Sequence, residues 1–74
     1  MTIPKELARK LAVRLREKIA RKTGIHLTMS EILPVMEAMP ESLVFVRGSA
    51  PQSEGEIDKV AEDFAEVMLH VFVN

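Results

Sequence analysis

The chain has 74 residues, a formal net charge of -1 and no cysteine, and hydrophobic residues make up 47% of it. A chain this short buries only about 60% of its unfolded surface, so we expect a single small domain over residues 1–74. Because the chain has no cysteine, disulfides and thiolate metal sites are excluded. The apolar runs are too short to cross a bilayer, and the N-terminus lacks the pattern of a signal peptide.

A first helix is predicted over residues 4–23. Thr2 can cap its start, Pro4 is tolerated in a first turn, and Gly24 suits the left-handed position that ends many helices. Apolar side chains recur every four residues and form one stripe for packing: Leu7, Leu11, Leu15 and Ile19, with Ala8 and Ala12 beside them.

A second helix is predicted over residues 29–39. Thr28 and Glu31 have the spacing of a capping box. Pro34 removes one helical hydrogen bond and favours a kinked or late-starting helix. As an alternative, the alternation of apolar and polar residues fits a short strand over 25–29. The expected buried face of the helix consists of Ile32, Val35, Met36 and Met39.

The segment 42–47 is ambiguous between a short strand and a short helix. Its β-branched and aromatic residues favour a strand, whereas Pro40 and Glu41 before it, with Gly48 after it, are typical start and stop signals of a helix. Small and turn-forming residues predict a flexible connector over 48–54.

A third helix is predicted over residues 55–71, which makes the fold mainly α, a small three-helix domain. Ser53 and Glu56 form a second capping-box pattern, and the β-branched end of the chain favours fraying or a strand. We expect Phe64 and Leu11 among the most buried side chains. The predicted buried face consists of Ile57, Val60, Ala61, Phe64, Val67, Met68 and Val71.

Charge is strongly segregated along the chain. Residues 1–27 hold eight basic and two acidic side chains, a net of +6, while residues 28–74 hold two basic and nine acidic ones, a net of -7. Two rows repeat every four residues: a basic row of Lys10, Arg14, Lys18 and Lys22, and an acidic row of Asp58, Glu62 and Glu66.

The two rows allow two interpretations. They face each other, within one chain or across a dimer, or lie in solvent, where ion pairs contribute little to stability. Alternatively, the basic row binds an external polyanion, since cations one helical turn apart can follow nucleic-acid phosphates.

Catalytic and metal-binding patterns are missing from the sequence. The two histidines, His26 and His70, are far apart and lack ligand spacing, and no serine sits in a nucleophile motif. The Gly-containing segment after residue 47 lacks the lysine of a phosphate loop. We therefore expect no enzyme activity, no cofactor, no metal and no small-molecule substrate.

The sequence favours a non-catalytic protein–protein interaction module of regulatory or adaptor type. We expect it to act in the cytoplasm as a homo-oligomer, most simply a dimer, without a membrane and with room for a second protein partner. Leu69 and Val73 align with the acidic row rather than with the expected core, so they join the two charged rows as candidate interaction residues. The alternative is a small DNA- or RNA-binding regulator that uses the basic first helix.

Overall fold

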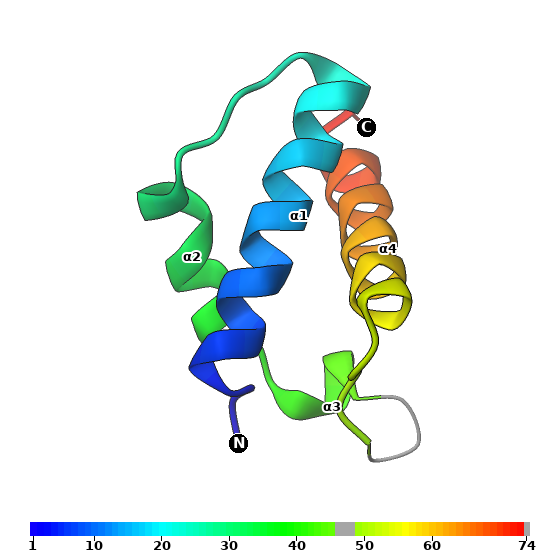
Figure 1. Cartoon of the computed structure of the whole chain (residues 1–74). Coiled ribbons are helices and arrows are strands. Elements are labelled where there is room, and N and C mark those ends of the chain that lie inside the picture. Colours follow the sequence, from blue (N-terminus) through cyan, green and yellow to red (C-terminus); the bar gives the residue numbers. More distant parts are fainter. Residues whose placement is uncertain (46–48, 74) are drawn as a thin grey trace.

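Four helices form the fold in this computed structural model, which describes residues 1–45 and 49–73 except the side chains of residues 72 and 73 (Figure 1). Three helices have at least seven residues and the described residues form no sheet, which confirms the predicted mainly α fold. The helices are α1 (Lys5–Thr23), α2 (Met29–Glu37), α3 (Glu41–Val44) and α4 (Glu54–Val73).

Helix α1 is the centre of the molecule, with α2 on one side and α4 on the other (Figure 1). Helix α2 runs antiparallel to α1, whereas α4 runs parallel to it. The α1 helix ends as predicted, because Gly24 adopts a positive φ of 78° and its N–H donates to the Ala20 carbonyl at 2.8 Å. The predicted apolar stripe is confirmed, since its members are at most 8% exposed: Leu7, Ala8, Leu11, Ala12, Leu15 and Ile19.

The chain before α1 does not cap the helix as predicted. The N-cap position belongs to Pro4, while Thr2 forms an isolated antiparallel bridge with Pro40. The N–H of Ile3 donates to the Met39 carbonyl at 3.1 Å in the same region. The predicted Thr2 cap is therefore wrong, because pairing with the segment between α2 and α3 keeps this part of the chain extended.

Helix α2 begins at the predicted residue. The N–H of Thr28 donates to the Glu31 carboxylate at 3.0 Å, and this hydrogen bond lowers the pKa of Glu31. Pro34 lies inside the helix on the exposed side, and the helix ends at Glu37, before the predicted end at residue 39. Residues 25–28 belong to no strand, so the alternative strand is wrong.

The buried face of α2 is narrower than predicted. Ile32 and Met36 are buried, and Met39 after the helix packs partly against the core, but Val35 is 47% exposed. Leu33 packs against the core instead. The prediction for Val35 is wrong. The i, i+3, i+4, i+7 spacing defines an apolar face of the helix that is wider than the part covered by a neighbouring helix.

The ambiguous segment begins as a helix. Pro40 holds the N-cap position of α3, and Val44, only 2% exposed, anchors this short turn in the core. Phe45 is already extended, and residues 46–48 lie outside the described part of the chain. In the predicted connector, Pro51 is buried.

Helix α4 starts at a complete capping box and ends later than predicted. The N–H of Glu56 donates to the Ser53 hydroxyl and the N–H of Ser53 donates to the Glu56 carboxylate, both at 3.1 Å. Hydrogen bonds from Ser53 lower the pKa of Glu56. The helix continues to Val73, so the fraying or strand predicted for the chain end does not occur in the described residues up to 73.

The buried face of α4 is rotated relative to the prediction. Ile57, Ala61 and Ala65 are at most 2% exposed, whereas Val67 and Val71 are 60% and 69% exposed. The small side chains at 61 and 65 allow α4 to lie close to α1. Val60, Phe64 and Met68 are only partly buried, so the prediction for Phe64 is wrong. The largest fully buried side chains are Leu11, Leu15, Ile32, Met36 and Val44.

Candidate functional site

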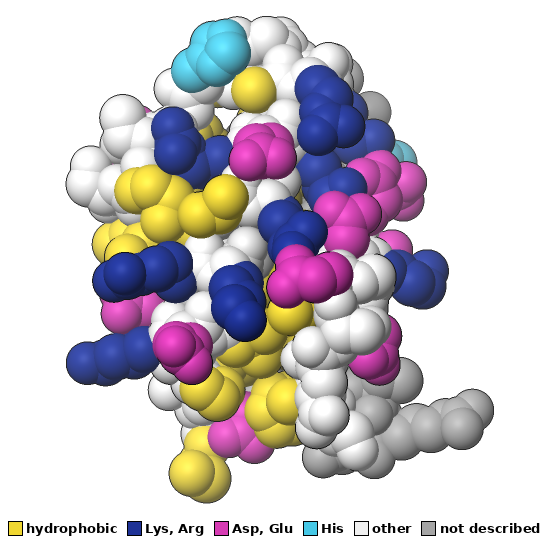
Figure 2. Space-filling model, viewed as in Figure 1, with side chains coloured by type: hydrophobic (Ala, Val, Ile, Leu, Met, Phe, Trp, Pro, Cys, Tyr) yellow, Lys and Arg dark blue, Asp and Glu magenta, His cyan; other side chains and the backbone are white. Residues whose placement is uncertain are grey.

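Basic side chains of α1 meet acidic side chains of α4 along the junction of the two helices (Figure 2). The Lys18 Nζ lies 3.1 Å from the Asp58 Oδ2 and 3.0 Å from the Glu62 Oε2. The Lys22 Nζ lies 2.7 Å from the Glu62 Oε1. The two charged rows therefore face each other within one chain over most of their length.

Arg14 extends this network toward the start of α4. Its guanidinium pairs with Glu54 and lies 3.7 Å from the Asp58 Oδ1. The sequence prediction omitted Glu54, although it stands four residues before Asp58 and continues the same row. The residue numbers of the paired side chains rise together along α1 and α4, as they do in two parallel neighbouring helices.

Lys18 is the centre of the network. Its side chain is only 12% exposed, although it reaches two carboxylates. Hydrogen bonds with Glu62 and Asp58 raise the pKa of Lys18, and hydrogen bonds from Lys22 and Lys18 lower the pKa of Glu62. Both shifts favour the charged forms, so the ion pairs persist over a wide pH range.

The remaining members of the rows lie apart from this network. Neither Lys10 nor Glu66 has an ion pair among the described residues. Leu69 is partly buried, and the side chain of Val73 lies outside the described part. Of the predicted interaction residues, the structure brings together Arg14, Lys18, Lys22, Asp58 and Glu62.

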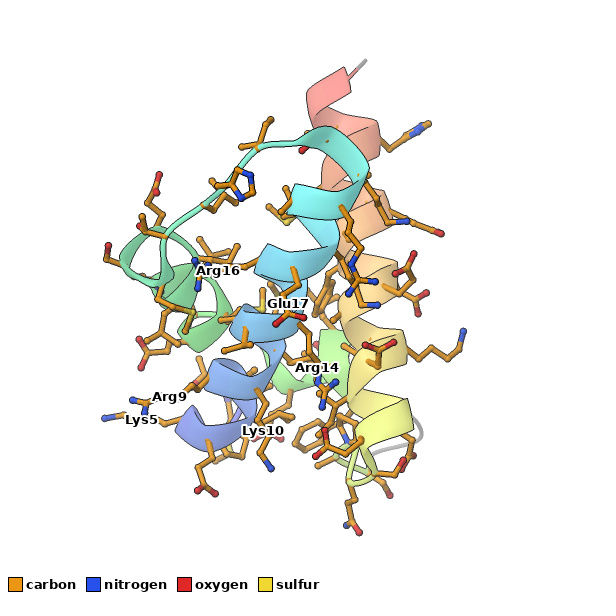
Figure 3. All side chains as sticks on the ribbon, turned by 45° about the horizontal axis from the view of Figure 1, so that its top comes forward. Lys5, Arg9, Lys10, Arg14, Arg16 and Glu17 are labelled. Carbon is orange, nitrogen blue, oxygen red and sulfur yellow. The ribbon has the colours of Figure 1, made fainter. Side chains whose placement is uncertain are left out.

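Basic side chains that form no ion pair with the described residues of α4 make up a second group on α1. Lys5 and Arg9 point away from α4, on the side where α2 lies (Figure 3). Arg16 is directed toward the segment before α2, where its Nε–H donates to the Leu27 carbonyl at 2.6 Å. Lys10 borders a shallow open hollow together with Arg9 and Val13. These residues keep positive charge at the surface after the ion pairs with α4 are counted.

An apolar surface on the outside of α4 was missed because its residues match the periodicity of the core. Val67 and Val71 are the exposed residues there, one helical turn apart. They border a shallow open hollow together with Asp63, Glu66 and His70. A tighter assignment centred on Ala61 and Ala65 would have placed both valines outside the core.

Within residues 1–45 and 49–73, neither a metal-binding cluster nor a bilayer-crossing helix is present. No group of three or more His, Asp or Glu side chains there is arranged to hold a metal ion. Within the same ranges, no helix has both the length and the apolar character that crossing a bilayer requires.

The charge network predicts a pH-dependent effect of E62Q. In the folded protein the pKa of Glu62 is below its usual value of 4.5. Such a carboxyl stabilises the fold above its unfolded-state pKa and loses this effect as the pH falls through the folded-state value. At pH 7, E62Q should therefore unfold at a lower urea concentration than the wild type. In acid, the unfolding midpoints of the two proteins should converge.

E66Q is the matched control, because Glu66 has no ion-pair partner in the described part of the chain. It should stay closer to the wild type at pH 7. Equal losses of stability in E62Q and E66Q at pH 7 would contradict a specific role of the Lys18–Glu62–Lys22 contacts.

The structure thus offers two surfaces of different chemistry. The ion pairs of Lys18 hold α1 and α4 together, while Val67 and Val71 expose apolar surface at the edge of the molecule. No protein-family model matches the chain, and neither does any curated protein or any solved structure.

Proposed function

We propose that the protein is a small, non-catalytic protein–protein interaction module of regulatory or adaptor type that acts as a homo-oligomer, most simply a dimer. The observation that supports this function best is the exposure of Val67 and Val71 on the same face of α4. Single exposed apolar side chains are ordinary, but neighbouring ones are typical of interaction surfaces.

The small core gives a second reason for association. Of the described buried apolar residues, four are alanines and none is aromatic. Alanine contributes little apolar area, and domains of this size commonly gain stability from a partner subunit. Covering the two valines would add buried apolar area that a single chain lacks.

Nucleic-acid binding through α1 is the second candidate. Its support is the positive charge that Lys5, Arg9 and Lys10 leave at the surface. The ion pairs of Arg14, Lys18 and Lys22 make this candidate less favourable. Phosphates would have to displace the α4 carboxylates that already bind these side chains. Duplex binding that weakens steeply with salt would favour this candidate.

Self-association predicts a solution mass above that of the 8.3 kDa chain. Sedimentation equilibrium from micromolar to millimolar concentration should show a mass that rises toward twice this value, because association follows mass action. A mass of one chain across this whole range would contradict the proposed function.

A further inference from the structure

Four apolar residues form a regular line on the outer part of α4, and we call them the α4 seam: Val60, Phe64, Val67 and Val71. Their spacings of four, three and four residues match the repeat with which two helices pack side chains into each other. Val60 and Phe64 are partly buried, whereas Val67 and Val71 are mostly exposed. The seam thus emerges from the edge of the core into solvent.

The surroundings leave the seam accessible. Figure 1 shows α4 at the edge of the molecule, with α1 along one side of it. The exposed end of the seam borders the shallow hollow that also includes Asp63, Glu66 and His70. This shape suits another helix better than a small molecule, since an open surface cannot enclose a ligand.

We propose that the α4 seam docks on the same seam of a second copy, with the two α4 helices antiparallel across a two-fold axis. This inference rests on the proposed self-association and specifies its interface. With the axis between Ala65 and Glu66, Phe64 of each copy lies opposite Val67 of the other. Val60 then lies opposite Val71, so every seam residue has an apolar neighbour, and the larger Phe64 faces the smaller Val67.

The flanking charges select the antiparallel direction. Asp63 and His70 each directly precede a seam residue and therefore flank the line on the same side. An antiparallel pair brings Asp63 of each copy close to His70 of the other, where an imidazole N–H can donate to the carboxylate. A parallel pair would instead place Asp63 of one copy beside Met68 of the other, so the carboxylate would lose its imidazole partner.

The overall charge and size favour a second copy as the occupant. A net charge of -1 creates little repulsion between identical chains. The two-fold arrangement uses one surface twice, as closed dimers do. One helix pair covers less than the roughly 800 Å² per partner of a typical stable interface, so we expect micromolar affinity.

Disulfide trapping tests the direction of pairing, because the chain has no cysteine of its own. V60C, V71C and their equimolar mixture are oxidised under native conditions and analysed by non-reducing electrophoresis and mass spectrometry. The mixture should yield the mixed disulfide, while each variant alone should yield little dimer. In the antiparallel pair, identical positions are eleven residues apart, about 16 Å along the axis, whereas a disulfide needs Cα atoms roughly 4.4–6.8 Å apart.

L43C provides the control for random collisions, because Leu43 on α3 is 62% exposed, similar to the 69% of Val71. Two outcomes would overturn the antiparallel arrangement. One is a yield of disulfide dimer from V60C alone that equals the yield from the mixture. The other is a yield of mixed dimer no higher than the dimer yield of L43C. If the wild type is dimeric, either result would contradict the proposed interface but not the proposed self-association. A monomeric wild type would overturn both proposals.

Charge insertion gives a second, independent readout. V67D should remain helical by circular dichroism, since the side chain at position 67 is in solvent in a single copy. The dissociation constant of its dimer should rise at least tenfold. L43D, matched in exposure, should dimerise like the wild type. Equal dimerisation of V67D and the wild type would overturn the proposed seam.

Discussion

Replacing Leu11 by alanine should lower the free energy of unfolding by about 2–5 kcal/mol, the usual range for a large-to-small change in a core. Leu11 is fully buried on α1, the helix that lies between α2 and α4. A domain of this length is stabilised by roughly 4–11 kcal/mol in total. The variant should therefore melt at a much lower temperature, by about 4–8 °C for each kcal/mol lost.

Two controls make the Leu11 result specific. L43A removes the same atoms from a side chain that is 62% exposed, so its stability should stay close to that of the wild type. F64A should be less damaging than L11A, because Phe64 is only partly buried. If F64A lost more stability than L11A in urea unfolding, the observed rotation of α4 would be contradicted.

Reversing the charge of Lys18 should have the second-largest effect. K18E removes two close ion pairs and places a third carboxylate beside Asp58 and Glu62. Networks of several charges contribute more than isolated surface pairs, so we expect the melting temperature to fall by about 4–8 °C at low salt. Added salt should reduce the difference, because it screens the new repulsion.

The double variant K18E/E62K tests whether these two residues act on each other. Exchange of the charges should recover part of the stability lost in K18E, because the contact at 3.0 Å can reform with opposite polarity. K18E/E66K is the control, since Glu66 has no ion pair with Lys18. Equal recovery in both double variants would show a general charge effect instead of a direct contact.

Local signals were sufficient for the end of α1 and for the start of α2. Gly24 ends α1 and the Thr28 N–H bonds to Glu31 at the start of α2, as the sequence predicts. Each signal involves residues at most a few positions apart, so local geometry determines it. Thr2 fails for the opposite reason, because its backbone pairs with Pro40, which is distant in the sequence.

The candidate site could be predicted only as far as each helix alone determines it. The four-residue spacing showed that Lys18 and Glu62 belong to rows of like charge. It did not show that the rows face each other, or that Lys10 and Glu66 are left out, because this depends on the relative position of α1 and α4. Parallel packing of these helices decides which charges meet.

By itself, the sequence determined the mainly helical fold, the stripe of α1 around Leu11 and the separation of positive from negative charge. Tertiary structure alone decided that Val67 and Val71 face solvent while Ala61 and Ala65 are buried. The physical reason is that periodicity defines an apolar arc on a helix but not the part of that arc that another helix covers. The position of α1 makes this choice, because close packing on the alanines and the ion pairs beside them fix the rotation of α4.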